Sequence, residues 1–425
     1  MKRTGRISLI IAAFFMALGL GGAPAQAGGI GVYEMGTPDV GLAAAGWAAR
    51  AQDASTVFKN PAGMSFLEKS ELQAGLQALY GNVNFSPNSQ TTTTGGDGGN
   101  PVGWVPGGSL FYARKLTPDL SVGMGVFSYF GASLKYDDSW AGRYYNQEST
   151  LIGYTFMPAV SYRITPWLSV GGGLNATYGS MKMKVAVKNF DRADGQITVE
   201  DNEWGYGANV GVLAEPFKGT RIGVDYMSQM KLKFSDVPSY SGIGPGLDAI
   251  LRNRNAYNAS LDMGIYIPQM VMGSVYQELG SKWAVMANVG WQQWSKFGKV
   301  DVTIVNNEAD STTMDAKFDD TWHVAGGVQY SPLKPVTFTA GVGYDSSAVK
   351  DQYRSVAVPM GETYRFGLGV LWEMAPNLKS GLSYEYALTP NMKVDQERGP
   401  RAGRLSGEYD KFAVRTIALN LSWQF

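Results

Sequence analysis

Hydrophobic and polar residues alternate with a period of two along most of the chain after residue 70. In the C-terminal stretch Ile417, Leu419, Leu421, Trp423 and Phe425 share one face, and the residues between them are Ala, Asn, Ser and Gln. Successive side chains of a strand point to opposite faces, so the pattern predicts strands with one apolar face. Many apolar faces begin or end with Trp or Tyr, and Gly, Ser, Asn and charged residues fill the other faces. This combination favours a transmembrane barrel over a sandwich, which would bury large residues on its inner face.

Two sizes of connection alternate strictly between the predicted strands. Six short and seven long connections give thirteen in all, and therefore fourteen strands with both chain ends on the periplasmic side. We predict an all-β, transmembrane antiparallel β-barrel of about fourteen strands over residues 71–425. The short connections lie at 117–119, 165–167, 215–220, 278–282, 331–335 and 374–377, and the long ones around 85–106, 131–150, 189–203, 235–258, 305–316, 346–361 and 391–410.

The first 27 residues have the three-part layout of a secretory signal peptide. Lys2, Arg3 and Arg6 precede an apolar stretch over residues 7–20, and an Ala-Gln-Ala cleavage site ends at Ala27. The apolar stretch is shorter than the about 20 residues that a membrane span needs. We therefore predict export with cleavage after Ala27. No long apolar run follows, which excludes an α-helical membrane protein.

Residues 28–70 do not follow the alternating pattern. Glycine recurs every five residues among small residues from Gly36 to Gly46, and the triplet Asn60-Pro61-Ala62 follows. Proline removes a backbone donor and Asn-Pro favours a turn, so the segment is compact and not a strand. The lumen of a fourteen-strand barrel must hold water or be filled. Because the segment is small and apolar, we predict that it is a hatch (plug) inside the lumen, with a linker as the alternative.

Composition limits the chemistry. The chain has 36 basic and 36 acidic residues, no cysteine and a single histidine, His323. A balanced charge argues against nucleic-acid binding, and one histidine excludes a multi-histidine metal site. No P-loop, Gly-x-Ser-x-Gly motif or convincing dinucleotide motif is present, so we expect neither a cofactor nor enzymatic activity. Many of the 54 glycines fall on inward strand faces, where a missing side chain leaves room for a plug and a ligand.

Several segments resemble a known family. Residues 28–34 resemble its mature N-terminus, and residues 53–64, which contain the Asn-Pro-Ala triplet, resemble its hatch. On these segments the chain resembles the FadL family of outer-membrane transporters of long-chain fatty acids and hydrocarbons. The resemblance implies a monomeric barrel closed by an N-terminal hatch, with lateral release of an apolar ligand through a third-strand kink beside the triplet. Further matches lie at residues 158–166, 203–207, 219–223 and 344–347.

The resemblance and the alternation together give candidate site residues. The third strand is expected over residues 120–130. Arg365 is a candidate anchor for a carboxylate, because a guanidinium can form a bidentate pair; membership of a lumen charge network, shared with His323, is the alternative. Packing against the hatch is the alternative for the apolar candidates. The hatch and gate candidates are Asn60, Pro61, Ala62, Gly123 and Gly125, and the ligand-binding candidates are Ile30, Val32, Phe127, Tyr129, Met157 and Arg365.

The expected function is passive uptake of long-chain fatty acids or similar hydrophobic molecules across the bacterial outer membrane. An apolar route avoids hydration, which costs about 0.8 kcal/mol per CH₂. Uptake of aromatic hydrocarbons, which needs no carboxylate anchor, and a non-specific aqueous porin are the alternatives. A barrel enzyme acting on lipids is disfavoured by the motifs, and the outer loops leave room for a phage-receptor or adhesion role. Other expected partners are outer-membrane lipid, lipopolysaccharide and, through the terminal aromatic Phe425, the barrel-assembly machinery.

Overall fold

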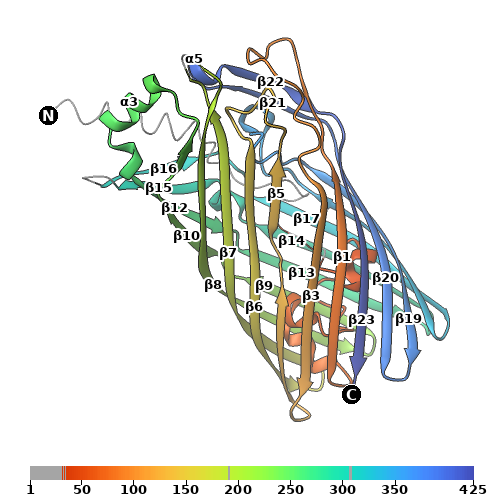
Figure 1. Cartoon of the computed structure of the whole chain (residues 1–425). Coiled ribbons are helices and arrows are strands. Elements are labelled where there is room, and N and C mark those ends of the chain that lie inside the picture. The colour runs from red at the N-terminus through yellow and green to blue at the C-terminus, as the bar shows by residue number, and fades with distance from the viewer. Residues whose placement is uncertain (1–30, 32, 34, 190–191, 306–308) are drawn as a thin grey trace.

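The structure is a computed structural model that describes residues 31, 33, 35–189, 192–305 and 309–425 (Figure 1). The predicted signal peptide and the candidates Ile30 and Val32 lie outside these residues. Fourteen antiparallel strands close into one barrel. They are β1 (Glu71–Asn82), β3 (Gly103–Lys115), β4 (Leu120–Phe127), β6 (Glu148–Thr165), β7 (Leu168–Val187), β8 (Gly195–Phe217), β9 (Thr220–Met227), β13 (Met270–Leu279), β14 (Trp283–Gln292), β17 (Thr321–Leu333), β18 (Val336–Asp345), β19 (Thr363–Ala375), β20 (Leu378–Thr389) and β23 (Phe412–Gln424).

Neighbouring barrel strands follow one another along the chain, and the first and last strands close the ring. β1 pairs with β23 from Glu71 opposite Gln424 to Asn82 opposite Ala413. The short turns lie at the end of the barrel where the C-terminus lies (Figure 1). The predicted antiparallel barrel of fourteen strands is therefore confirmed.

The distribution of side chains is the reverse of that in a barrel in water, because apolar side chains point outward and small or polar ones point inward. In β23 Leu419, Leu421 and Trp423 are exposed, whereas Ala418 and Asn420 are buried inside. Toward both ends of the wall an exposed tryptophan pairs with a half-buried tyrosine of an adjacent strand, as Trp104 does with Tyr80 and Trp283 with Tyr330. An outward apolar band between two aromatic belts is the surface of a barrel in a bilayer. Among the described residues, no helix has the length and apolar character to cross a membrane.

The strands continue beyond the barrel into the long connections. β5 (Gly131–Lys135) follows β4, and β11 (Ser239–Ser241) pairs with β8. Residues 195–203 were expected to be a loop but belong to β8. Their side chains alternate between inward and outward, but at the outer end of the barrel the outward ones are not apolar, so the sequence pattern does not show a strand there. The remaining elements are β10 (Met230–Asp236), β12 (Ser260–Ile267), β15 (Lys299–Val305) and β16 (Ala309–Asp315) in one sheet, β2 (Phe85–Pro87), β21 (Met392–Glu397) and β22 (Arg404–Tyr409) in another, and α3 (Pro245–Asn253), η3 (Ala256–Asn258), α4 (Trp294–Phe297), η4 (Asp351–Tyr353) and α5 (Gly399–Ala402).

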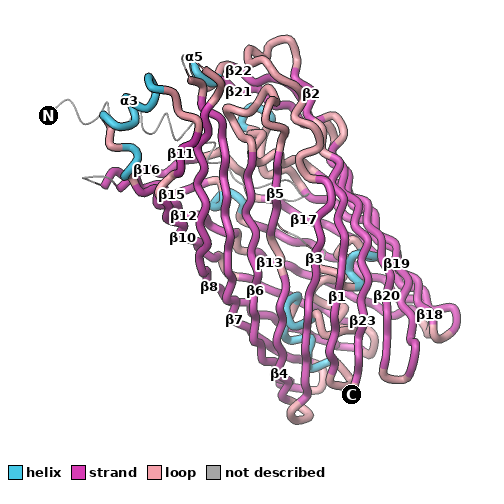
Figure 2. Tube along the Cα trace, viewed as in Figure 1, coloured by secondary structure: helices cyan, strands magenta, loops and turns pink. Residues whose placement is uncertain are grey.

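Residues 35–67, which we call the hatch segment, pack inside the barrel (Figure 2). Their short helices are η1 (Pro38–Leu42), α2 (Thr56–Lys59) and η2 (Pro61–Phe66). The backbone of the segment lies directly against inward glycines of the wall. A side chain at Gly341 would collide with the carbonyl of Leu42, and one at Gly223 with the carbonyl of Ala48. These inward glycines therefore give the hatch segment its room.

Candidate functional site

The hydrogen-bonded wall is interrupted in the third strand. β4 pairs with β6 as far as Phe127 opposite Thr155, and β5 resumes the pairing at Gly131 opposite Ile152. Three residues, 128–130, therefore stand opposite two, which makes a one-residue β-bulge. We call residues 128–130 the third-strand bulge. On the other side of the third strand lies β3, which pairs with β4 over residues 110–115. Among the described residues, 103–109 of β3 have no strand partner on the side that faces β4 and β5.

A cavity of about 210 Å³ occupies this gap, and we call it the wall cavity. Its lining includes Val105 and Gly107 of β3, Ile152 and Tyr154 of β6, and Met35 of the hatch segment. Tyr154 is exposed on the membrane-facing side, whereas Met35 is buried inside. The wall cavity therefore connects the interior with the membrane-facing surface, and among the residues that the structure describes none that lines it is charged.

A second, smaller cavity of about 40 Å³ lies inside the barrel beside the bulge, and we call it the interior cavity. Tyr129 and Phe130 line it, whereas their neighbours Ser128 and Gly131 line the wall cavity. The bulge is therefore the partition between the two cavities. The other lining residues are Gly31, Tyr33, Trp47, Phe58, Met227, Ile267, Pro268, Met270, Gln292 and Trp294.

Aromatic rings connect the N-terminal region with the third strand. The ring of Phe58 lies 4.4 Å from that of Phe127 and 5.4 Å from that of Tyr129, centroid to centroid. On its other side Phe58 contacts Trp47 at 5.9 Å, and Trp47 contacts Tyr33 at 5.5 Å. Gly31 also forms a single antiparallel bridge with Phe130. The N-terminal region therefore covers the inner side of the bulge.

The third strand is regular where Gly123 and Gly125 lie. Gly123 faces Val57 and Met64 of the hatch segment, and Gly125 faces the rings of Phe111 and Phe127. The ladder with β6 is intact at both glycines, and its interruption begins after Phe127. Glycine permits a bend, but the bend here comes from an extra residue further along the strand.

The triplet Asn60-Pro61-Ala62 is fastened to the wall at another place. Asn60 caps η2 by accepting from the backbone N–H of Ala62 (3.1 Å), and its amide donates to the carbonyls of Ala48 (2.7 Å) and Val212 (3.0 Å). The hydroxyls of Ser161 and Ser169 donate to the carbonyl of Ala62. These bonds reach β6, β7 and β8. The contacts with the bulge come from Gly31 and Phe58 instead of from the triplet that the resemblance placed there.

Phe127, Tyr129 and Met157 are buried in the core that surrounds these contacts. Sequence reasoning did not single out Trp47, Phe58, Met227, Met270 or Trp294. Alternation alone would have pointed Met227 and Met270 inward, because their strand neighbours Tyr226 and Val271 are exposed. Nothing in the pattern marks Trp47 and Phe58, since the hatch segment has no period.

Arg365 lies in a buried charge network. Its Nε donates to Asp345 and its guanidinium also to Glu385, both at 2.8 Å. Asp345 also bonds to Nδ1 of His323 at 2.8 Å. The ring of Tyr33 lies over this network, 4.5 Å from the imidazole and 5.1 Å from the guanidinium carbon. Arg365 thus occupies the charge network that was the alternative to a ligand anchor.

A second charge network lies within the hatch segment and was not expected, because the segment was read as uncharged. Arg50 Nε lies 3.2 Å from Asp39, and Arg50 also bonds to Asp53. Lys59 bonds to Asp39 and lies 3.8 Å from Asp53. Burial by itself would raise the pKa of Asp53, but Arg50 and Lys59 lower it below its ordinary value. The two acids and two bases were visible in the sequence, and their equal number indicates pairing inside a plug.

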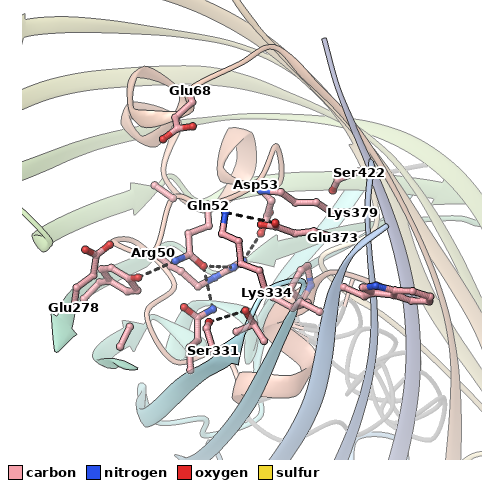
Figure 3. Close-up of a pocket in the computed structure, with 18 of the residues that line it drawn as sticks. Arg50, Gln52, Asp53, Glu68, Glu278, Ser331, Lys334, Glu373, Lys379 and Ser422 are labelled. Atoms are coloured by element: carbon pink, nitrogen blue, oxygen red, sulfur yellow. Dashed lines mark hydrogen bonds and ion pairs between the residues drawn. The ribbon is translucent and has the colours of Figure 1, made fainter. Parts of the chain in front are cut away.

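A third cavity, the vestibule, opens at the end of the short turns beneath the hatch segment (Figure 3). Its volume is about 540 Å³. Charged and amide groups from the hatch segment and several strands line it, and Gln52 bonds to Tyr276 (2.9 Å) and Gln329 (3.0 Å). The vestibule shares no lining residue with the two apolar cavities. The labelled lining residues are Arg50, Gln52, Asp53, Glu68, Glu278, Ser331, Lys334, Glu373, Lys379 and Ser422.

A membrane-facing apolar band, two aromatic belts and a filled lumen define an outer-membrane β-barrel. A family model described as "Outer membrane protein transport protein (OMPP1/FadL/TodX)" matches residues 20–425. The chain therefore belongs to the FadL/TodX family of bacterial outer-membrane transport proteins, which are channels and transporters and not enzymes. The resemblance found in the sequence is confirmed.

Individual relatives agree with this assignment. The chain is 24% identical over 430 residues to the "Long-chain fatty acid transport protein" of Escherichia coli O6:H1, with 93% of this chain and 95% of the relative covered. It is 25% identical to "Outer membrane protein P1" of Haemophilus influenzae, with 87% and 88% covered. A Pseudomonas aeruginosa FadL homologue shares the fold with a TM-score of 0.83, 19% identity and coverage of 93% of this chain and 100% of that chain. The Pseudomonas putida toluene transporter TodX gives 0.65 at 14% identity, with 89% and 98% covered.

Proposed function

We propose that the protein takes up long-chain fatty acids or other hydrophobic small molecules by passive diffusion, with lateral release into the outer membrane. The observation that carries this proposal is the uncharged passage at the third-strand bulge. Relatives named for long-chain fatty acids and solved structures named for toluene support a hydrophobic cargo of either kind.

The wall cavity suits release into the bilayer. Its volume of about 210 Å³ exceeds the about 150 Å³ of an engineered apolar cavity that binds benzene. It opens beside Tyr154, on the face of the barrel that contacts lipid. A cargo that leaves here passes from apolar side chains to lipid chains without entering water, which would cost about 0.8 kcal/mol per CH₂.

The interior cavity provides the gate. Its volume of about 40 Å³ is well below the about 150 Å³ of an engineered apolar cavity that binds benzene, so a cargo fits only after side chains move. The parts that cover it are Gly31, bridged to Phe130, and the rings of Tyr33, Trp47 and Phe58. Cargo binding would favour the conformation in which this N-terminal cover is displaced. Asn60 and its bonds to the wall would hold the rest of the hatch, residues 28–70 in all, in place.

Deletion of Ser128 tests lateral release. Removing the one extra residue lets β4 and β5 pair with β6 in a single register, which closes the gap opposite β3. Uptake of labelled oleate and toluene would be measured in cells that lack their own relatives of this protein, with Ser128→Ala as a control of unchanged length. We expect uptake by the deletion variant to fall to the level of cells without the protein. Full uptake by a correctly inserted deletion variant would disprove lateral release, and no uptake by the wild type would disprove the cargo class.

A further inference from the structure

None of the described residues that line the interior cavity is charged. Its polar side chains are neutral, and three of them already bond to one another. Nε2 of Gln292 donates to the hydroxyl of Tyr33, and the indole N–H of Trp294 donates to Oε1 of Gln292, both at 2.7 Å. The remaining polar groups of the described lining side chains are the hydroxyl of Tyr129 and the buried indole N–H of Trp47, and both are neutral. A head group in this cavity therefore meets only neutral partners.

The cations behind the cavity wall are occupied by carboxylates. Arg365, behind the ring of Tyr33, is held by Asp345 and Glu385. Lys59 lies 5.9 Å from the ring of Trp47 and bonds to Asp39. All these charged side chains are almost completely buried. If either cation turned to a ligand, it would leave buried carboxylates without their partner, which is strongly unfavourable.

Like those of the interior cavity, the polar side chains of the wall cavity are neutral. Apart from the hydroxyl of Tyr154 at the outer surface, its polar side chains are Gln77, Ser128 and Ser133, which are neutral. A carboxylate that moved from the interior cavity to the membrane would therefore stay desolvated and unpaired along the whole passage. The cost of burying an unpaired charge is far larger than the cost of burying a neutral polar group.

We propose that the passage selects cargo with an uncharged head group, so that hydrocarbons, esters and alcohols bind as such and carboxylic acids bind only when protonated. This proposal rests on the proposed function and narrows its cargo. It also gives the charge network at Arg365 a role. Without its carboxylate partners the guanidinium would attract an anion into the cavity, and the network prevents this.

Matched ligands of equal chain length test the proposal. Binding of labelled dodecanoate and methyl dodecanoate to the purified, detergent-solubilised protein would be measured at pH 8 and pH 5. We expect the ester to bind at least about tenfold more tightly than dodecanoate at pH 8. The affinity for the ester should be the same at both pH values, and the affinity for the acid should rise at pH 5 as its carboxyl group is protonated.

A matched pair of variants separates binding in the cavity from partition into detergent. Met227→Trp fills the interior cavity, whereas Val224→Trp places the same side chain on the outward face of the same strand. Specific binding should be lost in the first variant and kept in the second. Dodecanoate bound at pH 8 as tightly as the ester, and lost with Met227→Trp, would overturn the neutral-head proposal while leaving hydrophobic uptake intact. Binding of neither ligand would overturn the proposed function itself.

Glu385→Gln tests the electrostatic cause. Of the carboxylates in the described part of the chain, Asp345 and Glu385 hold Arg365, and the variant removes the second, so the affinity for dodecanoate at pH 8 should rise about tenfold while that for the ester stays the same. Glu373→Gln, which changes a carboxylate of the vestibule, is the matched control and should change neither affinity. If Glu385→Gln folds correctly and leaves dodecanoate binding as weak as in the wild type, charge does not set the selectivity and the proposal fails.

Discussion

The wall cavity and the vestibule are both large, and their chemistry is opposite. Uncharged, mostly apolar side chains line the wall cavity of about 210 Å³, and charged and amide groups line the vestibule of about 540 Å³. Transfer of a hydrophobic molecule from water into the wall cavity is favourable by about 0.8 kcal/mol per CH₂. The comparison teaches that the larger opening is not the better exit for such a cargo. It also separates two properties that experiments can change independently: sideways passage at the bulge, and closure by the hatch segment.

A carboxylate in the wall cavity should have the largest effect. Val105 lines this cavity and is half-buried, so Val105→Asp places a charge in the passage. We expect the initial uptake rate of labelled toluene to fall at least about tenfold, because 1.4 kcal/mol suffices for that factor and burial of a charge costs more. Val105→Thr, a neutral change of similar shape, should retain most of the uptake. Equal rates for the two variants would place the route elsewhere.

Arg50→Met should loosen the hatch segment without closing the wall. The change leaves Asp39 and Asp53 buried with only Lys59, and breaking a buried ion network in this way costs about 3–5 kcal/mol. We expect ion conductance in planar bilayers to rise while uptake of toluene continues. Lys334→Met is the matched control, because it removes an exposed cation of the vestibule. A rise of conductance in both variants would assign the effect to vestibule charge and not to the network.

Asn60→Ala should have a smaller effect in the same direction. It removes a helix cap, worth about 0.5–2 kcal/mol, and also the amide that donates to the carbonyls of Ala48 and Val212. We expect faster cleavage of the hatch segment by added protease and a modest rise of conductance. The control is Asn84→Ala, since Asn84 lies in an outer connection and its amide donates to Asn82, two residues away. Cleavage at the wild-type rate would show that the cap does not hold the segment.

Lowering the pH from 8 to 5 should have the smallest effect on conductance. Burial would raise the pKa of Asp39 and Asp53, but Arg50 and Lys59 lower both below their ordinary values. Because the folded pKa is lower than the unfolded one of about 3.9, this stabilisation is complete above that value and is lost as pH falls through the folded pKa. We expect constant conductance from pH 8 to pH 5 and opening only in stronger acid. Opening between pH 7 and pH 5 would point to a group outside this network.

Much of the fold could be predicted from the sequence, because a bilayer imposes a period of two on every strand that crosses it. The strand β23 and the short turns were recognised in this way. Outside the membrane that constraint ends, so residues 195–203 of β8 were taken for a loop. The hatch segment has no period at all. The equal number of acids and bases in its sequence indicates pairing, but which of Asp39, Arg50, Asp53 and Lys59 bond to one another is seen only in the folded chain.

The candidate site was predicted less completely, for a physical reason. Alternation indicates which side chains face inward, and Phe127 and Met157 are buried as expected. It cannot count how many residues stand opposite one another, so the break was sought at Gly123 and Gly125 instead of at residues 128–130. Nor does an inward arginine reveal its partners, which for Arg365 are Asp345 and Glu385 on the strands on either side of β19.

The bulge has a consequence for how such a protein can change over generations. One residue distinguishes a third strand that is continuous with β6 from one that leaves β3 unpaired over residues 103–109. One residue is one codon. Under the proposed lateral release, a sealed barrel and a laterally open barrel are a single in-frame insertion or deletion apart, with no change in the number of strands. The proposed passage would then be closed by one deletion that leaves the other strands of the barrel unchanged.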